Sequence, residues 1–246
     1  MSTKAEWKSN KLGFFESTTH ERVMRLAPVQ FYEEFLGAYT TIPAGGAAES
    51  GCLWAHKQVL TGGTPVTAIK GDEVNGVCQC ALDATSEEQE AIVYMDDNRQ
   101  FSIEQGLIFE TRVKIAVLPT LTAEAVFGLC GDYAKGPDNV TYSLFFTADG
   151  SGEVFCEADD NASDQSATSG VTATAAQTKI YRIDARDVTD IRFYIDGAHV
   201  ASSTTFVYAA TGANAILQPY FGLYKASGAG LGTIEVDYIR IWQDRA

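Results

Sequence analysis

The chain of 246 residues has the composition of a globular protein, with 46% hydrophobic and 20% charged residues. That composition excludes a disordered chain, a collagen and a disulfide-rich miniprotein, and no apolar run reaches the roughly 18–20 residues that a helical membrane span needs. Its 18 Lys and Arg residues face 32 Asp and Glu residues, which gives a net charge of −14. Because binding to phosphates needs a basic stripe, we predict no nucleic-acid partner, and we predict no membrane partner.

Residues 1–35 show no sustained alternation of apolar and polar residues, yet they carry six aromatic residues, more than a solvated tail needs. We predict an N-terminal extended arm over residues 1–35 that packs on a partner through Trp7, Phe14 and Phe15. An alternative boundary starts the first strand near residue 28 and leaves a shorter arm.

The first 20 residues lack the apolar segment of a signal peptide, which predicts synthesis in the cytoplasm. The five cysteines are an odd number. Cys78 and Cys80 are two residues apart, so on a strand both lie on one face and do not form a CxxC pair. We expect the thiols to be buried and reduced, because free cysteine packs as a small hydrophobic residue.

From about Val74 to the end, the chain alternates strand-like runs with turn clusters. The clearest run is Leu107–Val117, where apolar and charged residues alternate with the period of a half-buried strand. Asp196-Gly197 lies between two such runs and is a typical hairpin signal. The pattern predicts one all-β domain over residues 36–246, an antiparallel β-sandwich. The other expected strands are Val77–Asp83, Ala91–Met95, Ala125–Cys130, Thr141–Thr147, Glu153–Ala158, Lys179–Asp184, Ile191–Asp196, Phe206–Tyr208, Ile216–Tyr224 and Thr233–Trp242.

One pair of carboxylates has the spacing of a catalytic pair. Glu235 and Asp237 share a face of the last expected strand, and a retaining glycosidase places two carboxyls about 5–5.5 Å apart. Both alternate with apolar residues, including Tyr238, which indicates instead a solvent-facing row that Arg240 neutralises. The chain has no GxSxG and no HExxH motif. We therefore predict no catalytic and no cofactor-binding residues.

Two acidic loops, 149–152 and 159–164, could supply oxygen ligands for calcium, but neither has the EF-hand spacing. Loops rich in Asp, Asn and Gly commonly form turns, so we assign no metal ligand and leave calcium as an alternative. Sugar binding would use exposed aromatic residues, although aromatic residues of a sandwich more often belong to its core. The candidates are Trp54, Tyr133, Tyr224 and Trp242.

Three stretches resemble strands of the concanavalin A-like jelly rolls, the superfamily of laminin G domains and family 16 glucanases. Phe109–Lys114 (FETRVK) is similar to their FEARIK strand, Ile191–Val200 (IRFYIDGAHV) to their YIDG hairpin, and Val236–Trp242 (VDYIRIW) to their closing strand. The family 16 hydrolases carry Glu-x-Asp-x-(x)-Glu between the first two landmarks. Residues 118–190 lack this motif, and the nearest stretch, 157–161, lacks the final Glu. The resemblance therefore implies the fold without the catalytic motif.

The stretch 81–114 also resembles concanavalin A-like proteins of tailed bacteriophages, which are virion structural proteins and include capsid decoration (cement) proteins. This resemblance implies a non-enzymatic protein of the virion, made in the host cytoplasm. It would dock on the assembled shell, with the major capsid protein and copies of itself as partners. The alternative is a carbohydrate- or receptor-binding module of a phage fibre or tail that binds a surface glycan, and a glycoside hydrolase ranks third. The sequence leaves head or tail location and oligomeric state open.

Overall fold

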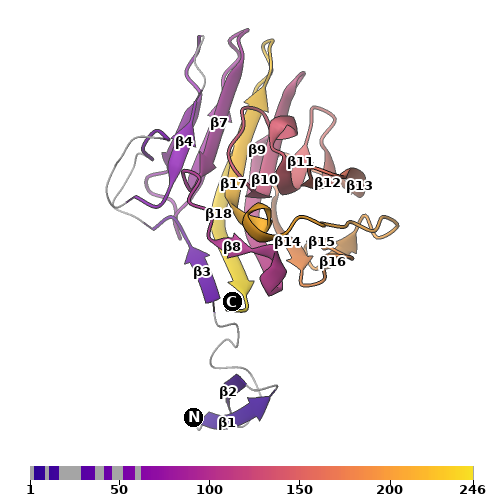
Figure 1. The fold of residues 1–246 in the computed structure, drawn as a ribbon. Coiled ribbons are helices and arrows are strands. Elements are labelled where there is room, and N and C mark those ends of the chain that lie inside the picture. Colours follow the sequence, from indigo (N-terminus) through magenta and orange to yellow (C-terminus); the bar gives the residue numbers. More distant parts are fainter. Residues whose placement is uncertain are drawn as a thin grey trace.

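The computed structural model describes residues 29–36, 42–45, 52–58 and 62–245, and the backbone of residues 3–8 and 11–16. Two antiparallel sheets pack face to face (Figure 1), which confirms the predicted all-β antiparallel sandwich. We call them the β10 sheet and the β9 sheet after a central strand of each. The strand order in the β10 sheet is β13-β12-β11-β10-β17-β7-β4, and β8 also pairs with β17. The strand order in the β9 sheet is β16-β15-β14-β9-β18-β6-β5, and β3 also pairs with β18.

The strands of the β10 sheet are β4 (Ala55–Lys57), β7 (Gln89–Tyr94), β8 (Phe101–Ser102), β10 (Ala123–Cys130), β11 (Tyr142–Ala148), β12 (Glu153–Asp160), β13 (Asp164–Thr172) and β17 (Ile216–Lys225). Those of the β9 sheet are β3 (Val29–Glu33), β5 (Val66–Ile69), β6 (Cys78–Leu82), β9 (Leu107–Val117), β14 (Thr178–Ala185), β15 (Arg192–Ile195), β16 (Ala198–Val200) and β18 (Gly232–Gln243). Three single-turn 3-10 helices are η1 (Ile103–Gln105), η2 (Pro137–Asn139) and η3 (Gly212–Ala215).

The core lies between the sheets, because each strand turns alternate residues inward. In β9 the buried positions alternate from Leu107 to Ile115, as the sequence predicts, but Val117 at the end of the strand is exposed. Tyr181 of the β9 sheet packs edge-on against Phe127 and Phe146 of the β10 sheet, at ring-centroid distances of 4.6 and 5.1 Å. Burying an aromatic side chain of this size contributes roughly 1.5–3 kcal/mol, so this contact is a main attachment between the layers.

The strands that carry the superfamily resemblance are neighbours in the β9 sheet. β9 pairs with β18, with Phe109 opposite Ile241, and β14 and β15 follow on the other side of β9. The Asp196-Gly197 hairpin is confirmed: Ile195 pairs with Ala198, and both turn residues have positive φ, as a two-residue turn of this type requires.

Part of the predicted arm belongs to the sandwich. β3, within the 1–35 segment, pairs with β18 at the position that the alternative boundary near residue 28 expected. Phe35 is buried in the core, and Phe31 packs on it with its ring 5.4 Å from that of Phe101. These two aromatic residues therefore have their partner in their own chain. Tyr32 alternates with them and is exposed.

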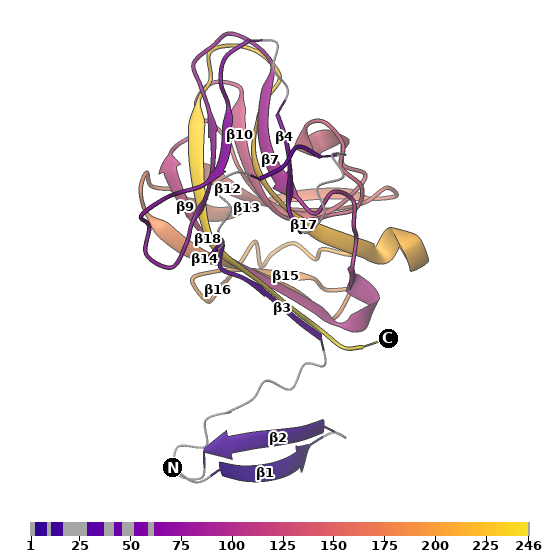
Figure 2. The same cartoon turned by 90° about the vertical axis from the view of Figure 1, so that its left-hand side faces the viewer.

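Upstream of the sandwich, β1 (Thr3–Lys8) and β2 (Lys11–Glu16) form a two-stranded antiparallel sheet. Among the described strands, neither pairs with a strand of the sandwich (Figure 2). We call this unit the β1–β2 hairpin. Residues 17–28 lie outside the described residues.

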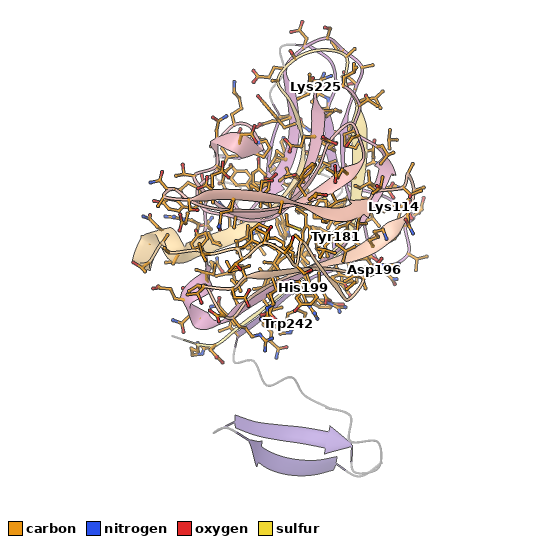
Figure 3. All side chains as sticks on the ribbon, turned by 90° about the vertical axis from the view of Figure 1, so that its right-hand side faces the viewer. Lys114, Tyr181, Asp196, His199, Lys225 and Trp242 are labelled. Atoms are coloured by element: carbon orange, nitrogen blue, oxygen red, sulfur yellow. The ribbon has the colours of Figure 1, made fainter. Side chains whose placement is uncertain are left out.

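A buried lysine holds one end of the sandwich together. Lys225, at the end of β17, is fully buried (Figure 3), and its Nζ donates hydrogen bonds to the carbonyl oxygens of Asp83, Thr85 and Gly230 at 2.6, 2.7 and 2.8 Å. Burial lowers the pKa of the ammonium group. Three carbonyls from two loops thus share one cation, which fixes the loop after β6 to the loop before β18.

Replacing Lys225 by Met is expected to reduce the free energy of unfolding by about 3 kcal/mol, because buried carbonyls lose their donor. Lys135→Met is the control, since Lys135 makes a surface ion pair with Glu88 worth less than about 1 kcal/mol. Urea unfolding followed by circular dichroism measures both. Equal midpoints for the two variants would show that the carbonyls do not need this cation.

Candidate functional site

The outer face of the β10 sheet carries a row of ionisable side chains. Tyr224 of β17 pairs with Glu90 of β7 on one side and with Glu124 of β10 on the other, so the three lie side by side. Glu157 of β12 lies further across the same face. Alternation explains the placement of Glu124 and Glu157, because their neighbours along each strand are apolar and face the core.

The loop between β10 and β11, residues 131–141, covers part of this face. Tyr133 donates its hydroxyl to Oε1 of Glu90, and Lys135 pairs with Glu88 at 2.9 Å. Gly136 has φ +78°, and a Cβ there would lie 3.1 Å from the ring of Tyr224. Glycine is therefore required at this position both for the backbone conformation and for the close approach to the ring.

Beneath this loop the outer face is filled by the chain's own aromatic side chains. Tyr94, Phe145 and Tyr220 are buried, with the Phe145 and Tyr220 rings 5.3 Å apart and the Tyr94 and Tyr133 rings also 5.3 Å apart. Here the sheet has a second apolar layer outside the main core. Within the described residues, the hydroxyl of Tyr220 and Oε2 of Glu90 are buried without a hydrogen-bond partner.

The environment of the carboxyls on this face favours their protonated form. Burial, with the charges of Glu157 and Asp138 next, raises the pKa of Glu124 to about 8. Burial also raises the pKa of Glu157 and outweighs the opposite effect of the 2.9 Å hydrogen bond from Thr147. In the same way, burial raises the pKa of Glu90 although the hydrogen bond from Tyr133 lowers it. Glu124 makes no hydrogen bond or ion pair with any described residue. A protonated and an ionised carboxyl side by side can act as hydrogen-bond donor and acceptor to a polar ligand.

The segment from β10 to β13 is strongly acidic. Residues 123–172 hold nine Asp and Glu residues against one lysine. Asp159 of β12 lies directly opposite Asp164 of β13, and like charges in that position destabilise a strand pair. Burial and the charge of Asp164 raise the pKa of Asp159. Neither aspartate forms an ion pair within the part of the chain that the structure describes.

The carboxylate pair singled out in the sequence lies on the other sheet and is neutralised there. Glu235 forms ion pairs with Lys70 and Lys114 at 2.9 and 2.8 Å, and Asp237 pairs with Arg112. Burial opposes ionisation of Glu235, but the hydrogen bonds from the two lysines outweigh it and lower its pKa. A buried acid with a lowered pKa is a poor proton donor, so these residues hold the sheet face together.

The predicted partner of that pair, Arg240, has a different role because β18 contains a bulge at 236–238. The bulge turns Tyr238 outward, where the expected alternation places it inward. The Arg240 guanidinium stacks on the rings of Tyr238 and Tyr32 at 4.0 and 4.5 Å. One extra residue in a strand reverses the facing of all that follow.

The two candidate calcium loops form turns. Oδ1 of Asp149 accepts the backbone N–H of Ser151 at 2.8 Å, and Oδ1 of Asp160 accepts that of Ser163 at 2.8 Å. Burial of Asp160 opposes ionisation, but backbone N–H groups, first that of Ala209, outweigh it and lower its pKa. Among the described residues, no three His, Cys, Asp or Glu side chains are placed to hold a metal ion.

The candidate sugar-binding aromatic residues are divided between core and surface. Trp54 is a core residue whose Nε1 donates to Glu33 at 3.0 Å. Tyr133 and Tyr224 lie on the outer face of the β10 sheet described above. Trp242 is half-buried near the end of β18 (Figure 3). In the described helices, no segment is long and apolar enough to cross a membrane.

The predicted arm anchors lie in the β1–β2 hairpin, and their side chains are outside the described part of the structure. The backbone register pairs Trp7 with Leu12, Ala5 with Phe14 and Lys4 with Phe15. Opposed residues share a face, so Trp7 and Phe14 lie on one face and Phe15 on the other.

Comparisons with known proteins identify the fold. No family model and no curated protein matches this sequence. A protein of unknown function from Shewanella oneidensis MR-1 is similar over 88% of this chain and 89% of its own, with a TM-score of 0.55 and 12% identity. A second similar structure comes from work on the endo-acting O-glycanases that prominent members of the human gut microbiota express to initiate mucin breakdown. It is similar over 87% of this chain and 99% of its own, with a TM-score of 0.55 and 12% identity.

The alginate lyase A1-II′ of polysaccharide lyase family 7 is similar over 71% of this chain and 82% of its own, with a TM-score of 0.51 and 12% identity. At these identities the likeness shows the fold alone. The neighbours are consistent with a concanavalin A-like jelly roll, as the sequence resemblance implies. Nothing in the comparisons links the chain to a phage.

The raised pKa of Glu124 predicts a pH dependence of stability. Because the folded state binds this proton more tightly than the unfolded chain, the contribution of Glu124 is present below its ordinary pKa of 4.5 and is lost as the pH rises through about 8. Denaturant unfolding across this window should show stability falling with rising pH. Glu124→Gln should flatten that slope, and Glu104→Gln, at an exposed site, should not. Equal slopes in all three proteins would contradict the assignment.

Proposed function

We propose that this chain is a non-enzymatic virion structural protein, most specifically a capsid decoration protein that docks on the assembled shell. The observation that carries the proposal is the β1–β2 hairpin, which forms a sheet of its own beside a complete sandwich. An isolated two-stranded hairpin is marginally stable in water. It therefore needs a surface to pack on, and the major capsid protein, with copies of this chain, is the partner that the bacteriophage resemblance suggests.

The hairpin has a face suited to docking. Its register places Ala5, Trp7, Leu12 and Phe14 together. Trp is the residue type most typical of interface anchors, surrounded by apolar contacts that exclude water. Specific docking needs more than about 1,000 Å² of buried surface, so we expect further contacts around the hairpin.

The outer face of the β10 sheet supports a structural role for the sandwich. The β10–β11 loop lies over this sheet, and Tyr94, Phe145 and Tyr220 fill the space beneath it. The sandwich then serves as a rigid body displayed outward. Its acidic surface keeps many copies soluble at high local density.

Stabilisation of the shell would follow from linkage. A protein that binds only the assembled shell stabilises it by RT ln(1 + [L]/Kd), which is about 4 kcal/mol when the free concentration is a thousandfold above Kd. No catalysis is needed for this effect. The protein would be made in the host cytoplasm and would reside in the virion.

Deleting residues 1–28 should abolish docking and leave the sandwich folded, because β3 and all later strands remain. Co-sedimentation with capsids of the major capsid protein measures docking, and circular dichroism with the unfolding midpoint checks the fold. Trp7→Ala with Phe14→Ala should weaken docking at least about tenfold, as loss of anchor residues does. Phe15→Ala, on the opposite face, is the matched control. Full docking by the truncated chain would overturn the proposal.

A carbohydrate- or receptor-binding module of a phage fibre or tail is the second candidate. It is supported by the half-buried Glu124 carboxyl beside Tyr224, with Glu157 further across the outer face of the β10 sheet. Such a module binds glycans at micromolar to millimolar Kd, roughly −4 to −8 kcal/mol. A glycan array should then give signals that Tyr224→Ala removes and that Tyr32→Ala, on the other sheet, leaves intact. A flat array would exclude this candidate.

A further inference from the structure

A row of polar and aromatic side chains crosses the outer face of the β9 sheet from β3 to β16. Each member lies directly opposite the next in the register of the neighbouring strands β3, β18, β9, β14, β15 and β16. In that order the members are Tyr32, Arg240, Glu110, Arg182, Tyr194 and His199. We call this set the arginine row. Neighbouring strands lie about 4.8 Å apart, so the row is about 24 Å long.

Both arginines of the row lie over tyrosine rings. The guanidinium carbon of Arg182 is 4.3 Å from the centre of the Tyr194 ring. That of Arg240 is 4.5 Å from the centre of the Tyr32 ring, and the Arg240 Nη2 donates a hydrogen bond of 2.6 Å to the Tyr32 hydroxyl. A guanidinium that is already held on a ring loses little conformational freedom when it binds an anion.

Arg182 has no carboxylate partner, which is exceptional in a chain of net charge −14. It forms no ion pair and no hydrogen bond with any described residue, and its Nε is buried without an acceptor. The arginines of the other described strands form ion pairs, namely Arg112 with Asp237, Arg192 with Asp190 and Arg240 with Glu110. Glu110 lies opposite Arg182, but its Oε1 accepts the Tyr238 hydroxyl at 3.1 Å. The charge of Arg182 is thus left for a partner.

Apolar side chains flank the arginine row on both sides. Trp242 and Ile108 lie opposite each other on one side and are half-buried, and Ile180 on the other side is exposed. Tyr32 and His199, at the two ends of the row, are exposed as well. Surfaces that combine Arg, Tyr and Trp have the composition of protein-binding anchors. The row therefore has the features of a docking surface for a polypeptide.

We propose that the arginine row binds an extended acidic peptide segment of a partner protein, with Arg182 as the carboxylate anchor and Tyr32 and Tyr194 as aromatic contacts. Charge complementarity carries the proposal, because the planar guanidinium fork matches a carboxylate with two parallel hydrogen bonds. An extended chain advances about 3.3 Å per residue, so the row accommodates about seven residues. This inference goes beyond the proposed function and depends neither on the hairpin nor on the shell.

Fluorescence anisotropy of a labelled peptide, titrated with the full chain, tests the inference. The probe is a heptapeptide of alternating Glu and Ser, in which the glutamates share one face when the peptide is extended. The same peptide with Gln in place of Glu is the ligand control. The Glu peptide should bind, and the Gln peptide should not, because it has no carboxylates.

Arg182→Gln should weaken binding of the Glu peptide at least about tenfold, as loss of one partner of a charge pair does. Arg182→Lys should restore only part of the affinity, because it returns the charge without the planar fork. Arg99→Gln is the matched control: it removes the same charge from an arginine that pairs with Asp132. It should leave binding unchanged. Unfolding midpoints of the three variants check that each is folded.

Equal binding of the two peptides, or no binding of the Glu peptide, would overturn the inference. So would unchanged binding by a folded Arg182→Gln variant. Two further measurements identify another occupant of the row. Binding of trigalacturonate in place of the Glu peptide would assign the row to an acidic saccharide. Self-association in sedimentation velocity that Arg182→Gln abolishes would assign it to a second copy of this chain, and either result would also contradict the proposal.

Discussion

The shared core between the two sheets fixes which residues of every strand face outward, and the surface chemistry depends on that constraint. A slip of one residue in β10 or β12 would move Phe127 or Cys156 to the surface and Glu124 or Glu157 into the core, so the register is strongly specified. The outward positions are free to carry charge. On the β9 sheet they hold paired ions, as at Glu235, and on the β10 sheet they hold acids without cations.

The two sheets therefore differ in how their outward-facing charges are compensated. On the β9 sheet, Lys114 and Arg112 of β9 form ion pairs with Glu235 and Asp237 of β18. On the β10 sheet, Tyr133 and Lys135 of the β10–β11 loop meet Glu90 and Glu88, while Oε2 of Glu90 is buried without a hydrogen-bond partner among the described residues. Beyond that loop the acids repel each other.

Periodicity predicted the sandwich well and the site poorly. Leu107–Val117 is identifiable as a strand because apolar and charged residues alternate in it. β13 (DQSATSGVT) has no such contrast, because it is an edge strand with small polar residues, and the sequence did not predict it. Phe206–Tyr208 was expected to be a strand, but it makes only the single bridge Ile191↔Phe206.

The outer-face acids were missed for a related reason. Glu124 and Glu157 lie on strands whose inward residues produce the apolar signal. No sequence feature shows that burial, and then the charges of neighbouring acids, raises their pKa values. That information depends on which strands become neighbours, since β10 lies between β11 and β17.

The central claim is that the hairpin becomes stable only against a partner. Amide hydrogen exchange of β1 and β2, in the free chain and on assembled capsids, tests it directly. We predict fast exchange in the free chain at low concentration and strong protection on capsids; equal protection in both states, or none in either, would contradict the account.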